Sequence, residues 1–157
     1  MDDKIIVEKM HELAKKIDYE ITDLLWLKKA MYCKPLDDKK QEYADESLAT
    51  LGDTVLKLIL TESLYNKGSN KAEITNKKQK MEDNNTLFKL CNKYGIYKYA
   101  YNDTYIFTEA PLEKQLPHPQ HDFYIEAVIG AIYKDKGLEY CRNWVINFFN
   151  KNNCLPD

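Results

Sequence analysis

The fold of this chain is decided by the stretch from Glu46 to Leu56, which reads Glu-Ser-Leu-Ala-Thr-Leu-Gly-Asp-Thr-Val-Leu. Its apolar residues recur at steps of three and four, and this helical spacing extends without a break over roughly residues 42–65. Glu46 and Asp53 are two helical turns apart, so both carboxylates share one face, about 10 Å apart along the axis. Asp53 follows Gly52 in a largely apolar sequence, where burying a carboxylate is costly unless a metal ion or a partner charge compensates it.

A second acidic segment, residues 125–133, reads Ile-Glu-Ala-Val-Ile-Gly-Ala-Ile-Tyr and places Glu126 in a similarly apolar setting. Both segments contain small residues that let helices pack closely, so Asp53 and Glu126 could bind Mg²⁺ between two crossing helices. A bound Mg²⁺ can activate water for phosphodiester hydrolysis. The spacing alone also fits a plain helical bundle in which these acids form salt bridges or cap helices.

Helical spacing covers most of the rest of the chain, because only five glycines and five prolines interrupt its 157 residues. Thr22 or Asp23 can cap one further helix, and Gly95 can end another. We therefore expect one all-α domain over residues 1–157, with its core in about residues 10–150. The Tyr-rich residues 97–108 could hold a short extended piece. The further helices are expected at residues 4–16, 24–31, 73–81, 86–93, 120–136 and 138–150.

The overall composition excludes several classes of protein. A formal net charge of −2 is unlike that of a uniformly basic nucleic-acid-binding protein, so any nucleic-acid contact must come from local patches. The four cysteines are scattered and form no Cys-x-x-Cys pair, which favours a cytoplasmic or other intracellular compartment over a disulfide framework. No apolar run approaches the roughly 18 residues that span a bilayer, so we expect no membrane association.

The two acidic motifs resemble the signatures of the ribonuclease III family. Residues 46–56 are similar to the family's Glu-Arg-Leu-Glu-Phe-Leu-Gly-Asp-x-Val-Leu, and residues 125–133 to its later Phe-Glu-Ala-Leu-Ile-Gly-Ala-Ile-Tyr. Shorter matches at residues 17–19, 74–75 and 85–87 extend the resemblance over about residues 10–150 in the family's order. The resemblance implies a helical endonuclease domain with one long central signature helix.

Members of this family cut double-stranded RNA as dimers with Mg²⁺, which Mn²⁺ can replace, using four carboxylates per site. Asp53 and Glu126 match two of these carboxylates, and Glu46 matches a further, less central acid. The other two family positions fall on Ala49 and Phe123. The resemblance thus implies an endoribonuclease of double-stranded or structured precursor RNA. Its metal ligands would be Asp53 and Glu126, and its assisting acids Glu46 and Asp122.

Three interpretations account for the missing carboxylates. Asp122 lies one residue before the expected position, and a π-bulge could absorb the extra residue and restore a third ligand. The compact Mini-III branch of the family, which also lacks a separate RNA-binding module, has a similar pair of one aspartate and one glutamate. Alternatively, the active site has decayed, as in ribosome-associated relatives that keep the fold as an RNA-binding scaffold. A purely protein-binding role is a further alternative.

The signature also departs from the family at positions that affect the dimer. Its arginine is Ser47 here, and the phenylalanine that plugs the partner subunit is Thr50. We still expect a homodimer, because a single domain provides only half of a groove wide enough for an RNA duplex. We expect no separate double-stranded-RNA-binding domain within these residues.

Other candidate binding residues are less specific. The densest basic cluster predicts an RNA contact, with a solvated helix face as its alternative. His118 and His121 could touch a metal ion, although polar loop residues explain them equally simply. The tyrosines at residues 94–105 could stack on bases, but a packed, half-buried sheet or hairpin edge is the preferred interpretation. The basic cluster consists of Lys71, Lys77, Lys78 and Lys80.

Overall fold

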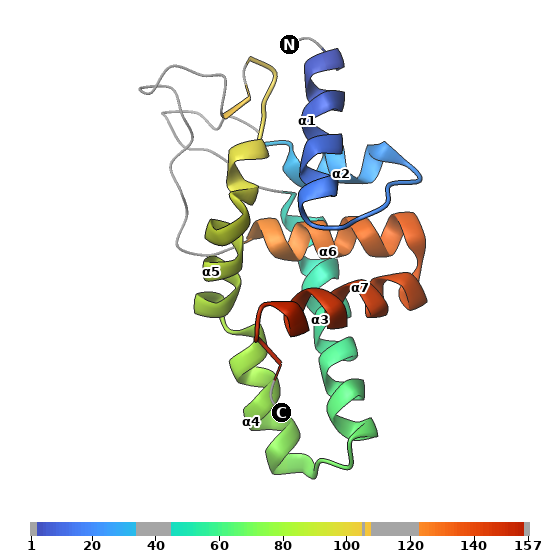
Figure 1. Ribbon diagram of the computed structural model, residues 1–157, viewed down its shortest axis with the longest axis vertical. Helices are drawn as coiled ribbons and strands as arrows, with labels where there is room; N and C mark the ends of the chain where they lie inside the picture. Colours follow the sequence, from blue (N-terminus) through green and yellow to red (C-terminus); the bar gives the residue numbers. More distant parts are fainter. Residues whose placement is uncertain (1–2, 34–44, 105, 108–122, 156–157) are drawn as a thin grey trace.

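The structure is a computed structural model that describes residues 3–33, 45–104, 106–107 and 123–155. In that part of the chain the backbone is almost entirely helical, as the sequence predicts (Figure 1). No helix there is long and apolar enough to cross a membrane. The helices are α1 (Asp3–Lys16), α2 (Leu24–Met31), α3 (Glu46–Asn66), α4 (Lys71–Glu82), α5 (Asn84–Tyr94), α6 (Phe123–Lys136), α7 (Leu138–Lys151) and the short 3-10 helix η2 (Ile96–Tyr99).

Helix α3 is the long signature helix, but it begins later than the expected residue 42. Asp45 has extended backbone and its side chain accepts a hydrogen bond from the Leu48 amide at 2.9 Å. An N-cap of this kind satisfies an amide that has no partner inside the helix, so it marks the first turn. The helix therefore starts at Glu46, and residues 42–44 lie outside the described part of the chain.

Helices α4 and α5 are each slightly longer than the sequence pattern predicts, because their caps lie outside the apolar pattern. Asn70 and Glu73 form a reciprocal capping box at the start of α4. The Asp83 side chain accepts hydrogen bonds from the first amides of α5. Gly95 ends α5 in the left-handed conformation, with φ 61°, as its position in the sequence indicates.

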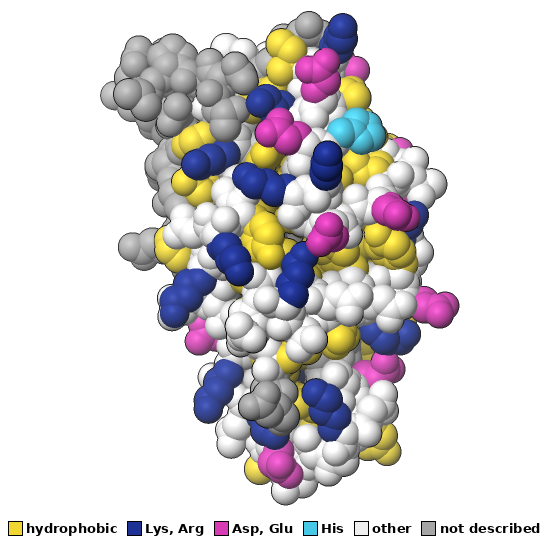
Figure 2. Space-filling model, in the orientation of Figure 1, with side chains coloured by type: hydrophobic (Ala, Val, Ile, Leu, Met, Phe, Trp, Pro, Cys, Tyr) yellow, Lys and Arg dark blue, Asp and Glu magenta, His cyan; other side chains and the backbone are white. Residues whose placement is uncertain are grey.

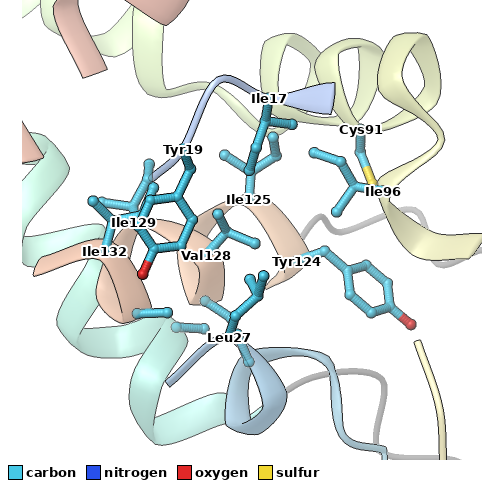
Figure 3. Close-up of a cluster of buried hydrophobic side chains, with 14 of the residues drawn as sticks. Ile17, Tyr19, Leu27, Cys91, Ile96, Tyr124, Ile125, Val128, Ile129 and Ile132 are labelled. Carbon is cyan, nitrogen blue, oxygen red and sulfur yellow. The ribbon is translucent and has the colours of Figure 1, made fainter. Parts of the chain in front are cut away.

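Helix α6 lies at the centre of the molecule and crosses α3, while α2 and α7 pack against it (Figure 1). It is apolar on nearly all sides, which is the pattern of a buried helix. Figure 3 shows how Ile17, Tyr19 and Leu27 from other segments meet Val128 and Ile129 of α6. The fully buried residues of α6 with at most 1% exposure are Tyr124, Ile125, Ala127, Val128, Ile129, Ala131 and Ile132.

The loop between α1 and α2 is tied to the end of α6 by Asp135. The carboxylate of Asp135 accepts hydrogen bonds from the Thr22 amide at 2.9 Å, the Asp23 amide at 2.7 Å and the Tyr19 hydroxyl. Burial, together with this carboxylate, raises the pKa of Tyr19. Nearby, the Trp144 indole donates to the Ile17 carbonyl at 2.9 Å. The loop is thus fixed before α2 begins.

The expected extended piece in residues 97–108 is limited, among the described residues, to isolated bridges at Tyr101. The Tyr101 amide donates to the Met31 carbonyl at 3.0 Å, and the Cys33 amide donates to the Tyr101 carbonyl at 2.7 Å. The preceding residues form η2 instead. This segment therefore fastens the end of α2 to the region after α5 without building a sheet.

Candidate active site

The candidate site begins at the crossing of α3 and α6, where two glycines allow the helices to touch. A Cβ atom at Gly52 would lie 1.7 Å from the carbonyl oxygen of Glu126. A Cβ atom at Gly130 would lie 2.3 Å from the carbonyl oxygen of Leu48. Neither distance is possible for a real side chain, because the neighbouring atoms belong to helical backbone and cannot rotate away. Glycine at both positions is therefore required for this close crossing.

This crossing brings the two acidic motifs together. Asp53 directly follows Gly52, and Gly52 lies against the backbone of Glu126. Both Asp53 and Glu126 are partly exposed, so their side chains are not sealed in the core. The structure thus brings the backbones of the two segments that carry these sequence-predicted site residues into contact, although 72 residues separate Asp53 from Glu126 in the chain.

The Asp53 carboxylate already has a cationic neighbour. Its Oδ2 atom lies 3.0 Å from the Nζ atom of Lys57, one turn further along α3, and 34% of its side chain is exposed. An exposed ion pair between residues four apart in a helix contributes only about 0.3–0.5 kcal/mol. This ion pair by itself therefore opposes the approach of another cation to Asp53 only weakly.

The remaining predicted acids differ in position. Glu46 is exposed in the first turn of α3, where a carboxylate also interacts favourably with the positive end of the helix dipole. Asp122, and with it the proposed π-bulge, lies outside the described residues, as do His118 and His121. Ala49, at the family's second glutamate position, is 1% exposed, so this position contributes to packing and carries no carboxylate.

The donor set at the crossing fits a hydrated Mg²⁺ better than a fully coordinated metal centre. In the part of the chain that the structure describes, no group of three His, Cys, Asp or Glu residues is placed to hold a metal ion. Mg²⁺ retains several water ligands and commonly binds through only one or two carboxylates and substrate phosphates. Asp53 and Glu126 can supply such a pair.

The four lysines of the predicted basic cluster all belong to α4 but differ in position. Lys77 and Lys80 line a cavity between α4, α5 and the residues after α7, whereas Lys71 is exposed at the start of α4. Lys78 is half-buried. Lys89 and Lys93 of α5 line the same cavity but were not among the residues predicted from the sequence. Because Lys89 and Lys93 are four residues apart, their spacing could have indicated that both lie on one face of a helix.

The described tyrosines at residues 94–105 pack in the structure, as predicted, but the predicted sheet or hairpin edge is wrong for Tyr94, which ends α5, and for Tyr97 and Tyr99, which lie in η2. The Tyr94 ring lies 5.0 Å from that of Phe148, and the Tyr97 ring lies 5.5 Å from that of Phe107. The Tyr99 hydroxyl donates to Glu12 at 3.2 Å. These contacts use the rings for internal packing, while Tyr105 lies outside the described residues.

One face of α3 points away from α6. Ser47 and Thr50, the two positions that depart from the family signature, are exposed there, as is Thr54. Leu58 on the same helix is 50% exposed and adds an apolar side chain to this face. Thr50 donates its hydroxyl to the Glu46 carbonyl at 2.8 Å, so it turns back onto its own helix instead of projecting from it.

An all-α domain whose two acid-bearing helices cross at glycines has the fold of ribonuclease III nuclease domains. One structure of the nuclease domain of ribonuclease III from Campylobacter jejuni has a TM-score of 0.71 at 23% identity, covering 94% of this chain and 97% of that chain. A second structure, from work on flexibility in the region involved in its dimer formation, has a TM-score of 0.70 at 22% identity, covering 89% and 95%.

The sequence comparisons identify the family. The model of the Ribonuclease III domain matches residues 46–137, and the chain belongs to the ribonuclease III family. Ribonuclease 3 of Nitratiruptor is 31% identical over 141 residues, which are 87% of this chain and 58% of that protein. Ribonuclease 3 of Caenorhabditis briggsae is 27% identical over 150 residues, which are 88% of this chain and 13% of that protein. The chain thus spans less than two thirds of the length of these relatives.

Proposed function

We propose that this domain is a Mg²⁺-dependent endoribonuclease that hydrolyses phosphodiester bonds of double-stranded or structured precursor RNA. The observation that carries the proposal is the contact of Gly52 with the backbone of Glu126, which brings the family's two acidic motifs to one place. Two partly exposed carboxylates from different helices can then act on one substrate phosphate. Membership of the ribonuclease III family supports this chemistry.

In this proposal Asp53 and Glu126 hold the metal ion, and Glu46 and Asp122 assist them. When bound, Mg²⁺ or Mn²⁺ supplies an activated water as the nucleophile and stabilises the charge on the leaving oxygen. The protein side chains position these partners and form no covalent bond to the RNA. The pair of one aspartate and one glutamate is the arrangement expected of the compact Mini-III branch, and that assignment stays a prediction.

We further propose that the functional unit is a homodimer. The exposed face of α3 carries the half-exposed Leu58 and the small residues Ser47 and Thr50. A second copy packed on this face would cover Leu58 and extend the RNA-binding surface. Without the plugging phenylalanine of the family, the dimer would depend on wider contacts, so sedimentation over a range of protein concentrations should show a reversible monomer–dimer equilibrium. A single monomeric species throughout would contradict this part of the proposal.

The nuclease proposal is tested by cleavage of a labelled RNA duplex with Mg²⁺ or Mn²⁺. We expect Asp53→Asn and Glu126→Gln each to slow cleavage at least about 100-fold, because metal binding supplies several kcal/mol of transition-state stabilisation. Glu139→Gln removes an exposed carboxylate on α7 and should leave the rate unchanged. Absence of cleavage by the unaltered protein with either metal would refute the enzyme proposal.

The decayed scaffold is the second candidate, and the buried Ala49 at a family carboxylate position favours it. A scaffold should bind RNA with strong salt dependence and without any need for a divalent metal. Reversing two charges with Lys77→Glu and Lys78→Glu should then weaken binding. A protein that neither cleaves nor binds RNA would instead favour a protein-interaction role.

A further inference from the structure

Away from the α3–α6 crossing, a cavity of about 570 Å³ opens between α4, α5 and the residues that follow α7. Met81 of α4 and Leu90 of α5, each 3% exposed, contribute apolar surface to it. Figure 2 shows Lys and Arg side chains over the face on which α4, α5 and α7 lie. The size is within the range of about 300–1,000 Å³ that is typical of small-molecule sites.

The charge around this cavity has one sign. Lys77 and Lys80 come from α4, and Lys89 and Lys93 from α5. Each pair is three or four residues apart, so each helix directs both ammonium groups to the same side. Among the described residues that line the cavity, none carries a carboxylate. A concave surface lined by charges of one sign focuses the field and attracts counter-ions of the opposite sign.

Uncharged side chains hold part of the cavity wall in place. Lys93 donates a hydrogen bond to the side-chain oxygen of Asn152, which follows α7. The Asn152 amide nitrogen in turn donates to the Phe148 carbonyl at 2.8 Å, so Asn152 is held by the helix it follows. The Thr86 hydroxyl donates to the Lys80 carbonyl at 3.1 Å and links the two helices at the cavity wall. An ammonium group has three donors, so Lys93 keeps donors for a ligand.

We propose that this cavity binds a phosphate group, carried either by an RNA backbone or by a free nucleotide. Four lysines from two helices can surround the oxygen atoms of a phosphate group, which share one negative charge in an RNA backbone and up to two in a free nucleotide. Lysine binds phosphate as a compact point charge. The apolar surface of Met81 and Leu90 lies beside the charged rim and suits a sugar or a base attached to that phosphate. The RNA form of this inference rests on the proposed function, whereas the nucleotide form does not.

The first arm of the test uses small probes on the whole chain without divalent metal. Inorganic phosphate and adenosine monophosphate are titrated while the backbone amide resonances of Thr86, Lys89 and Asn152 are followed by NMR. The variant carries Lys77→Gln and Lys89→Gln, one change on each wall. We expect it to bind these probes about tenfold more weakly, because two of the four lysine charges that face the phosphate are removed and water screens part of each interaction.

The matched control carries Lys15→Gln and Lys98→Gln, which remove the same charge from exposed lysines outside the cavity. It should bind like the unaltered protein. The thermal unfolding midpoints of the three proteins verify that each is folded. The measurement requires neither a divalent metal nor RNA cleavage, so its result does not depend on whether the domain is a nuclease.

The second arm measures binding of an RNA duplex to Asp53→Asn protein with and without the two cavity substitutions, across a salt series. A weaker complex and a salt slope smaller by about two would assign the phosphate to an RNA backbone. If the cavity substitutions weaken the binding of phosphate and adenosine monophosphate but not of the RNA duplex, the result would support the site and assign it to a free nucleotide. Equal binding of all probes by the cavity variant and the control would overturn the proposal.

Discussion

Two glycines at the helix crossing determine whether the candidate site can exist. Gly52 and Gly130 each lie against the backbone of the facing helix, so the helix axes approach more closely than any other residue would permit. That approach places the residue before Asp53 against the backbone of Glu126. The same glycines therefore serve packing and, in our proposal, the chemistry of the site.

We predict that Gly52→Ala destabilises the domain and reduces any nuclease activity. The added methyl group would have to displace the Glu126 carbonyl, which lies 1.7 Å from its ideal position. Overpacking usually costs about 1–3 kcal/mol, and a clash with helical backbone belongs at or above the upper end. Urea unfolding measures this loss, and the activity of the folded fraction shows whether separating α3 from α6 also disturbs the acids.

The control for this substitution is Ser47→Ala, on the exposed face of the same helix. Because alanine favours helix, it should leave the free energy of unfolding unchanged within about 0.5 kcal/mol. Equal stability of Gly52→Ala and Ser47→Ala would show that the two helices do not meet closely at residue 52.

Asp135 is a second single residue with a large expected effect. Its carboxylate accepts from two loop amides and from the Tyr19 hydroxyl, so Asp135→Asn replaces an acceptor oxygen with a donor. Leaving these donors without an acceptor should cost about 1–3 kcal/mol in the free energy of unfolding. Asp18→Asn, at an exposed residue whose ion pair with Lys151 is on the surface, should cost much less. Similar losses for both would contradict the proposed anchoring role.

At the scale of helices, periodicity predicted the existence and order of the seven described α-helices, because most of them bury one apolar face. Periodicity did not predict where α3, α4 and α5 begin. Asp45, Asn70 and Asp83 begin α3, α4 and α5 through side-chain hydrogen bonds, and such polar residues do not take part in an apolar pattern. The sequence also identified α3 as the longest helix, but the burial of α6 on nearly all sides became evident only from its packing.

The cap at the start of α4 provides a test at this scale. We predict that Asn70→Ala lowers stability by about 1 kcal/mol, because the Glu73 amide loses its acceptor and the capping box is broken. Asn76→Ala, in the middle of the same helix and exposed, should be neutral or slightly stabilising. Hydrogen exchange of the first amides of α4 would locate the effect. Unchanged exchange there would argue against the cap.

At the scale of the whole molecule, the candidate site is a product of the fold. The sequence identified Asp53 and Glu126 as separate acids, and only the crossing of α3 and α6 brings the two segments that carry them into contact. The basic cavity was only half predicted, because Lys77 and Lys80 belong to one conspicuous cluster whereas Lys89 and Lys93 are spread along the next helix. The spacing of residues within one helix does not show which other helix lies next to it.

Buried tyrosines give the whole domain a predictable sensitivity to alkali. Burial raises the pKa of Tyr101 to about 12, and burial together with Glu12 raises the pKa of Tyr99 to about 12, from an ordinary value of 10.0. Above pH 10 the unfolded chain releases these protons while the folded chain retains them, so the unfolded state is favoured. Stability should therefore fall as the pH rises from about 10 through 12, by at most about 1.4 kcal/mol per pH unit for each tyrosine.

Tyr101→Phe isolates one of these contributions. The variant loses the hydrogen bond from the hydroxyl to the Lys28 carbonyl, at 3.0 Å, and should be about 1 kcal/mol less stable at neutral pH. Its stability should then decline less steeply above pH 10, so the two curves converge as the pH approaches 12. Tyr65→Phe, at a residue that is 71% exposed, should follow the unaltered protein throughout. Urea unfolding at a series of pH values measures all three curves, and parallel declines for Tyr101→Phe and the unaltered protein would show that Tyr101 ionises equally in both states.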